Sequence, residues 1–264
     1  MLSPVRALVL AVLVWTAALT SMVPARAQTE VDLALVLAVD ISNSMDPEEQ
    51  ELQRQGFVEA FRSPLVHKAI GSGMLGRIAV VYLEWAGPAI QHVTVPWTEM
   101  GSPEDAFSFA NRLAQAPIRR GPRTSISGAI DASMRLLRES NIEAVRRVID
   151  VSGDGVNNLG RSVIQARDEA LAQGVVINGL PLLLKRPTDA WESDNLDEYY
   201  RDCVIGGLGA FMIPVRERQQ FAEAIKTKII REIAGAAPKA RVVPTQVQPE
   251  RRSSCEMGVN PWAN

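Results

Sequence analysis

Oxygen-bearing side chains gather in three short polar stretches of the sequence. The first contains Asp40, Ser42 and Ser44, the second contains Thr124, and the third contains Asp154. These stretches offer carboxylate and hydroxyl oxygens but no cysteine or histidine, a donor set that suits hard divalent cations. We therefore predict a metal site that takes Mg²⁺ or Mn²⁺ in preference to Ca²⁺.

The elements around these stretches should bring them together. The apolar runs 31–39, 78–83, 145–152 and 175–180 are typical of strands buried on both faces of a parallel sheet. Asp40 follows the first run, Asp154 follows the run 145–152, and Thr124 precedes a predicted helix over 125–138. Carboxyl ends of parallel strands and the amino ends of the following helices share one edge of such a sheet, where binding sites form.

The alternation of strands and helices predicts an α/β fold. Residues 89–95 alternate in polarity and favour an antiparallel edge strand, whereas Pro214 favours an edge position for a strand over 210–215. Apolar residues recur every four positions from Phe221 to Ile233, which indicates a last amphipathic helix. We expect one domain over 28–235, with a doubly wound, mostly parallel six-stranded sheet and helices on both faces.

This pattern resembles the metal-ion-dependent adhesion site of von Willebrand factor A domains. The D-x-S-x-S motif at 40–44, the lone threonine before a small-residue helix and the Asp-Gly at 154–155 carry the resemblance, together with the order of elements. The resemblance implies that Ser42, Ser44 and Thr124 bind the metal through hydroxyls, and that Asp40 and Asp154 act directly or through water. It also implies a protein partner that presents an acidic residue to the metal.

A narrower resemblance concerns two further stretches. D-V-S-G-D-G-V-N-N at 150–158 and D-C-V-I-G-G at 202–207 are similar to those of an exported bacterial subgroup of that family, the DUF1194-like proteins. Many family members have a hydrophobic-Thr-Asp-Gly run where this sequence has Ser-Gly-Asp-Gly.

The ends of the chain carry other signals. Arg6, an apolar run over 7–19 and Ala25-Arg26-Ala27 together predict a signal peptide over 1–27, rather than an uncleaved anchor. Its removal changes the formal net charge from −2 to −4 and leaves no further membrane span. We expect a periplasmic or secreted protein, with a Pro-rich polar tail over 236–264.

Two cysteines remain after the predicted cleavage. Export implies an oxidising compartment, so we expect a disulfide between Cys203 and Cys255, with two free thiols as the alternative. From the order of elements, we expect the bond at the end of the sheet opposite the metal loops.

Several residues have simpler interpretations. Asp46, Glu49 and Ser125 are expected to cap helices, and Asn157 and Asn158 to form turns. We expect Trp191, Tyr199 and Tyr200 to pack against the domain, with a recognition patch as the alternative.

The same observations separate three classes of function. The near-neutral charge gives no electrostatic footprint for nucleic acid. An aspartyl phosphatase would need a second acid where Ser42 stands, and a serine hydrolase would need a nucleophile elbow and a histidine base. We therefore predict an exported, metal-dependent protein-binding module and no enzyme. The alternatives are a Mg²⁺-dependent hydrolase or phosphatase, and a structural domain with a purely stabilising metal.

Overall fold

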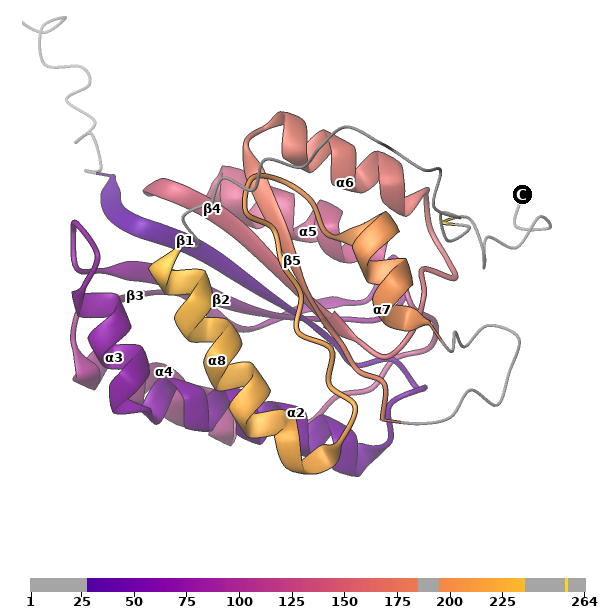
Figure 1. Cartoon of the computed structure of the whole chain (residues 1–264), viewed down its shortest axis with the longest axis horizontal. Helices are drawn as coiled ribbons and strands as arrows, with labels where there is room; N and C mark the ends of the chain where they lie inside the picture. Colours follow the sequence, from indigo (N-terminus) through magenta and orange to yellow (C-terminus); the bar gives the residue numbers. More distant parts are fainter. Residues whose placement is uncertain (1–27, 185–194, 236–254, 256–264) are drawn as a thin grey trace, which may run out of the picture.

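A five-stranded sheet forms the centre of the molecule, in the order β3-β2-β1-β4-β5 (Figure 1). The structure, a computed structural model, describes residues 28–184, 195–235 and 255. All neighbouring strands are parallel except β2 and β3. The strands are β1 (Thr29–Asp40), β2 (Ile78–Trp85), β3 (Gln91–Met100), β4 (Ile142–Gly153) and β5 (Val175–Pro181).

Helices cover both faces of this sheet (Figure 1). One face carries α2 (Pro47–Arg62), α3 (Pro64–Gly71), α4 (Pro103–Gln115) and α8 (Phe221–Ala234). The other carries α5 (Ile126–Glu139), α6 (Val163–Ala172), the short α7 (Leu196–Tyr199) and the π-helix η1 (Tyr200–Val204). A 3-10 turn, η2 (Arg218–Gln220), precedes α8. The predicted α/β fold with helices on both faces is confirmed.

The central strand β1 explains why the sheet is buried on both sides. Leu33, Leu35 and Leu37 pack into the core on the α2 and α8 side. Ala34 and Val36, which point the opposite way because side chains alternate along a strand, pack on the α5 and α6 side. Asp40, the last residue of β1, is therefore carried to the carboxyl edge of the sheet by a strand with no exposed face.

Helix starts follow the predicted capping chemistry. Asp46 accepts a hydrogen bond from the Glu49 amide, and the Glu49 carboxylate accepts one from the Asp46 amide, which completes a capping box. Ser125 accepts from the Gly128 amide at the start of α5. These caps hold two helices at the edge where β1 and β4 end.

The predicted sixth strand is not formed as such. Residues 206–215 run beside β5 but make only isolated bridges with it, at Ile177, Gly179 and Leu182. The Phe211 amide donates to the Asn178 side chain at 2.8 Å instead of to a backbone carbonyl of β5. A continuous ladder therefore cannot develop, and five strands are found rather than six.

Asp150 lies inside β4, and its charge is balanced from α8. The Lys228 ammonium lies 2.9 Å from one Asp150 oxygen and 2.7 Å from a Glu232 oxygen, and all three side chains are 1% exposed. The Asn178 side-chain nitrogen donates to the second Glu232 oxygen at 2.6 Å. This buried ion triad ties α8 to the centre of the sheet.

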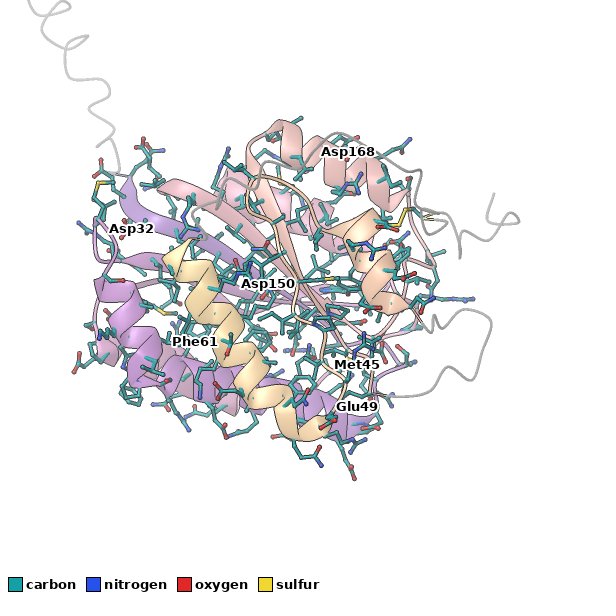
Figure 2. The ribbon with its side chains drawn as sticks, in the orientation of Figure 1. Asp32, Met45, Glu49, Phe61, Asp150 and Asp168 are labelled. Atoms are coloured by element: carbon teal, nitrogen blue, oxygen red, sulfur yellow. A yellow bond between two sulfur atoms is a disulfide. The ribbon has the colours of Figure 1, made fainter. Side chains whose placement is uncertain are left out.

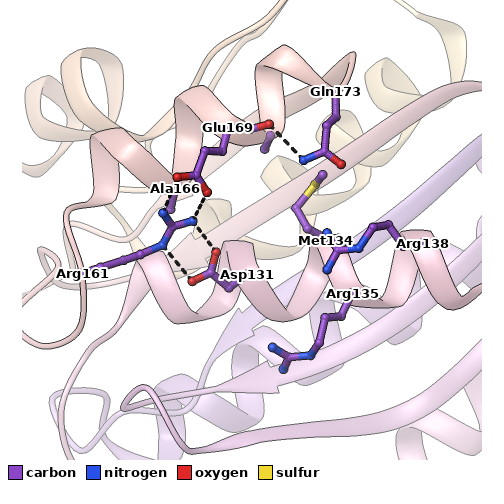
Figure 3. A pocket seen from close by; sticks show the side chains of 9 residues that line it. Asp131, Met134, Arg135, Arg138, Arg161, Ala166, Glu169 and Gln173 are labelled. Atoms are coloured by element: carbon purple, nitrogen blue, oxygen red, sulfur yellow. Dashed lines mark hydrogen bonds and ion pairs between the residues drawn. The ribbon is translucent and has the colours of Figure 1, made fainter.

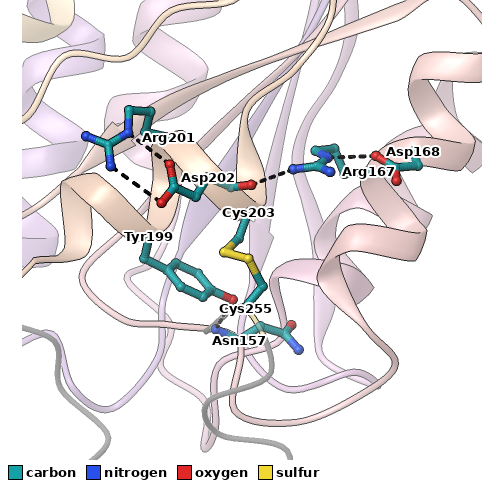
Figure 4. The surroundings of a disulfide bond; sticks show 8 residues. All are labelled: Asn157, Arg167, Asp168, Tyr199, Arg201, Asp202, Cys203 and Cys255. Atoms are coloured by element: carbon teal, nitrogen blue, oxygen red, sulfur yellow. Dashed lines mark hydrogen bonds and ion pairs between the residues drawn. A yellow bond between two sulfur atoms is a disulfide. The ribbon is translucent and has the colours of Figure 1, made fainter. Parts of the chain in front are cut away.

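The disulfide between Cys203 and Cys255 is present, with a Cα–Cα distance of 5.5 Å. Its expected place at the end of the sheet opposite the metal loops is wrong, because it lies beside Asn157 in the β4–α6 loop (Figure 4). After β5 the chain forms α7 and η1 against that loop before it runs along the sheet edge, and η1 carries Cys203.

The predicted signal peptide, most of the predicted tail and Trp191 lie outside the described residues. Within the described ranges, the helices are too short or too polar to cross a bilayer.

Candidate functional site

Three loops meet at the carboxyl edge of the sheet, as the sequence predicts. Asp32, near the start of β1, and Met45, just beyond its end, mark the two ends of this strand (Figure 2). The β1–α2 loop pairs with the loop before α5 through a bridge between Ser42 and Gly121, whose amide donates to the Ile41 carbonyl at 2.9 Å.

The predicted ligands of the first and third loops are joined by hydrogen bonds. The Ser42 and Ser44 hydroxyls lie 2.8 Å apart. Ser44 donates to an Asp154 carboxylate oxygen at 2.6 Å. Two loops that are 110 residues apart in sequence thus bring two hydroxyls and a carboxylate into contact.

Asp40 lies behind this group and is completely buried. Its Oδ1 accepts the Ser42 amide at 2.7 Å, whereas its Oδ2 has no hydrogen-bond partner. Burial raises the pKa of Asp40 well above its ordinary value, and the negative charge of Asp154 raises it further. A buried, partly unpaired carboxylate beside a second carboxylate is an arrangement that a bound cation would stabilise.

Gly153 explains how Asp40 and the third loop approach so closely. A Cβ at this position would lie 2.8 Å from the Asp40 Oδ2 and 3.2 Å from the Tyr200 hydroxyl. A side chain would therefore collide with the site. This contact gives a physical reason for the Ser-Gly-Asp-Gly run, in which glycine stands where many family members have threonine.

Thr124 reaches the same place from the second loop. It is 3% exposed, and its hydroxyl oxygen would lie 3.6 Å from a Cβ on Gly155, the residue after Asp154. Arg123, immediately before it, has a positive φ of 69°. Left-handed backbone costs free energy for a residue other than glycine, and such strained positions cluster at functional sites.

Two asparagines that were predicted only as turn formers connect the loops. Asn158 accepts the Thr124 amide at 2.9 Å through its side chain. The Asn157 side chain accepts the Ser127 amide at 3.0 Å and donates to the Arg161 carbonyl at 3.2 Å. The signal for these roles is their position, three and four residues beyond Asp154 in the same loop.

Arg120 is a further residue that sequence reasoning missed. Its guanidinium donates to the carbonyls of Asn43 and Met45, at 2.9 and 2.7 Å. It thereby fixes the backbone on both sides of Ser44. An arginine in a polar loop gives no such signal by its sequence position, because its partners are backbone groups of a distant loop.

A separate pocket of about 310 Å³ lies between α5 and α6 (Figure 3). At one end Arg161 bridges Asp131 and Glu169, with distances of 2.7 and 2.6 Å. None of the predicted metal ligands lines this pocket. Nor, in the part of the chain that the structure describes, do three His, Cys, Asp or Glu side chains gather to hold a metal. The predicted site differs in kind, with two carboxylates and three hydroxyls.

Solved structures that superpose on this chain identify its fold. The mussel byssus proximal thread matrix protein 1 superposes with a TM-score of 0.58 at 12% identity, over 78% of this chain and 49% of that one. The pilus adhesin SpaC from Lactobacillus rhamnosus GG gives 0.59 at 12% identity, over 78% and 31%. A von Willebrand factor type A structure from Catenulispora acidiphila gives 0.55 at 11% identity, over 77% and 43%.

The fold is therefore that of a von Willebrand factor A domain. This chain spans about half or less of each of those proteins. The chain belongs to the DUF1194 family, described as a protein of unknown function, whose model matches residues 30–237. Comparison with curated proteins gives no match. Another structure of the mussel protein has a metal-ion-dependent adhesion site (MIDAS) motif occupied by zinc.

The residues present fit the divalent cation that this fold implies. The fit rests on the unpaired Asp40 Oδ2, on the nearby Asp154 charge and on the Ser42 and Ser44 hydroxyls that connect them. All of these donors are oxygens, which matches the preference of Mg²⁺ and Mn²⁺.

Proposed function

We propose that this protein is an exported binding module that holds a divalent cation at the carboxyl edge of its sheet and recruits a protein partner through it. The single observation that carries the proposal is the contact between Ser42, Ser44 and Asp154, with the buried Asp40 behind them. The adhesin among the structures of the same fold supports the same class of function.

In the proposed site, Ser42, Ser44 and Thr124 supply hydroxyl ligands, and Asp40 and Asp154 supply negative charge. Three of these five ligands are neutral hydroxyls, which donate little charge, so a divalent cation bound here would stay electron-poor and could accept a further anionic ligand. An acidic side chain of a partner would be such a ligand, so the cation supplies a recognition point for a carboxylate. Mg²⁺ and Mn²⁺ remain the preferred candidates over Ca²⁺ because the ligands are few and small.

Binding is preferred to catalysis because of what surrounds the site. Ser42 occupies the position at which an aspartyl phosphatase needs its second acid. His67 lies on α3 and contacts the Phe61 carbonyl of α2. His92 lies on β3, which β2 separates from β1. Neither imidazole belongs to the three loops, so no serine of the described site has a histidine base beside it.

The proposed location is the periplasm or the extracellular space. The predicted signal peptide over 1–27 supports it, and so does the disulfide, since such bonds persist in oxidising compartments.

A capture experiment tests partner recruitment. The exported protein is immobilised and exposed to exported proteins of its source in Mg²⁺, in Mg²⁺ followed by a chelator, and with Asp40→Asn as the bait. Proteins that wild type retains, the chelator releases and the variant does not retain support the proposal. The same proteins in all three conditions would contradict it and favour a purely stabilising metal.

A further inference from the structure

Two consecutive tyrosines, Tyr199 and Tyr200, lie under the third loop, a few residues into the range 195–235. Tyr199 closes α7 and Tyr200 opens η1, and they are 1% and 0% exposed. Both rings pack in the core on the α5 and α6 side, as expected from the sequence. Their hydroxyls, however, point at backbone rather than at apolar neighbours.

Each hydroxyl contacts the backbone of a residue that flanks Asp154 in the sequence. Tyr199 accepts the Asn157 amide at 3.2 Å, three residues after Asp154 (Figure 4). Tyr200 faces the Gly153 carbonyl at 3.5 Å, one residue before it. The two phenols therefore hold the backbone on both sides of the carboxylate that completes the hydroxyl chain.

The Asn157 amide depends on the Tyr199 hydroxyl as its acceptor. Burial raises the pKa of Tyr199 to about 12, so its hydroxyl stays protonated. Asn157 is 2% exposed, so an amide hydrogen without the Tyr199 oxygen has little access to water. Phenylalanine would keep the ring packing and remove only the contact.

The disulfide anchors the same segment. Cys203 lies three residues after Tyr200 and is 0% exposed, and its bond to Cys255 closes a separation of 52 residues. The Arg167 guanidinium also donates to the Asp202 carbonyl at 2.8 Å, which ties η1 to α6. A covalent bond and a helix contact thus fix the two tyrosines against the loop.

We propose that Tyr199 and Tyr200 are positioning residues of the candidate cation site, which set the place of Asp154 by holding Asn157 and Gly153. The inference rests on the proposed function, because it assigns a role toward the same cation. In this role each tyrosine acts through the backbone of the third loop.

Two readouts on Tyr199→Phe test this role. The first is the hydrogen-exchange rate of the Asn157 amide without metal, which should rise about fivefold when its acceptor is lost. The second is Mn²⁺ affinity by calorimetry, which should fall by a similar factor. Tyr200→Phe should lower affinity less, because its contact is longer. Val66→Ala, a buried truncation in α3 that does not touch the loop, should lower stability but change neither readout.

The outcomes separate the two proposals. An unchanged exchange rate at Asn157, or faster exchange with unchanged affinity, would overturn the positioning role while the cation site stands. Wild type that binds neither Mg²⁺ nor Mn²⁺ would overturn the proposed function, and the positioning role with it. Faster exchange together with weaker binding supports both.

Discussion

Asn158 holds Thr124 through both backbone groups of the threonine. The Asn158 side-chain oxygen accepts the Thr124 amide at 2.9 Å, and the Thr124 carbonyl accepts the Asn158 amide at 2.9 Å. The loop that carries Thr124 is therefore hydrogen-bonded to the loop that carries Asp154. Hydroxyl and carboxylate are placed relative to each other by this pair.

Asn158→Ala should weaken this connection. The Thr124 amide loses its acceptor in a part-buried position, at a cost of about 1–2 kcal/mol in the free energy of unfolding. Urea denaturation measures the loss. Asn111→Ala is the matched control, because Asn111 accepts a bond from Arg62 at the exposed surface and should cost less than about 0.5 kcal/mol. Equal losses for the two variants would contradict the role of Asn158.

Arg123 gives a test of backbone strain before Thr124. Glycine adopts its φ of 69° without steric cost, whereas a β-branched residue does not. Arg123→Gly should therefore keep the free energy of unfolding within about 0.5 kcal/mol of wild type, and Arg123→Val should lower it by about 1–2 kcal/mol. Thermal and urea unfolding measure both variants. If valine were tolerated as well as glycine, the positive φ would not be maintained in solution.

The buried ion triad should respond strongly to loss of its cation. Lys228→Met leaves Asp150 and Glu232 buried without their counter-charge, which should cost about 3–5 kcal/mol. Asp150→Asn keeps the pair of Lys228 with Glu232 and should cost less. Urea denaturation at neutral pH ranks the two variants, and the reverse order would contradict this assignment of charges.

The triad also predicts a pH dependence. Burial raises the pKa of Asp150 above its ordinary value of 3.8, against the opposing effect of Lys228. Between the ordinary and the raised pKa, the folded state binds more protons at Asp150 than the unfolded state does. The contribution of Asp150 to stability is therefore present below pH 3.8 and is lost as pH rises through the raised value. Asp150→Asn should flatten the decrease in unfolding free energy from pH 4 upward, and parallel curves would contradict it.

The disulfide should stabilise the fold through the unfolded chain. Its separation of 52 residues corresponds to about 4 kcal/mol in the chain-entropy model. Cys255→Ser, with Cys203→Ser to avoid a free thiol, should lower the free energy of unfolding by about 2–4 kcal/mol. Reduced wild type should unfold at the same temperature as the double variant. A double variant as stable as oxidised wild type would contradict this estimate.

Most of the architecture could be predicted because the parallel strands are continuous apolar runs. β1 and β2 are buried along nearly their whole length, and the last helix repeats an apolar residue every four positions. The meeting of the three loops also follows from topology, since strand ends and helix starts share an edge. The predictions that rest on long apolar runs and on the helical repeat are therefore confirmed.

Features set by distant partners could not be predicted. The strand over 210–215 fails because Asn178, on β5, takes the Phe211 amide. The disulfide lies near the third loop because the chain after β5 forms helices there rather than crossing to the other end. Asn158 and Arg120 bind backbone groups of other loops, and Asp150 is satisfied by Lys228 from α8, 78 residues later.

Calorimetric titration of Mg²⁺ and Mn²⁺ into the protein tests the central claim most directly. Wild type should bind one equivalent of cation, and Asp40→Asn should bind at least tenfold more weakly, because it removes the buried charge behind Ser42 and Ser44. Asp168→Asn is the control, since Asp168 lies exposed on α6, away from the three loops (Figure 2), and should bind as wild type does. Absence of binding by wild type, or equal binding by Asp40→Asn, would contradict the cation site.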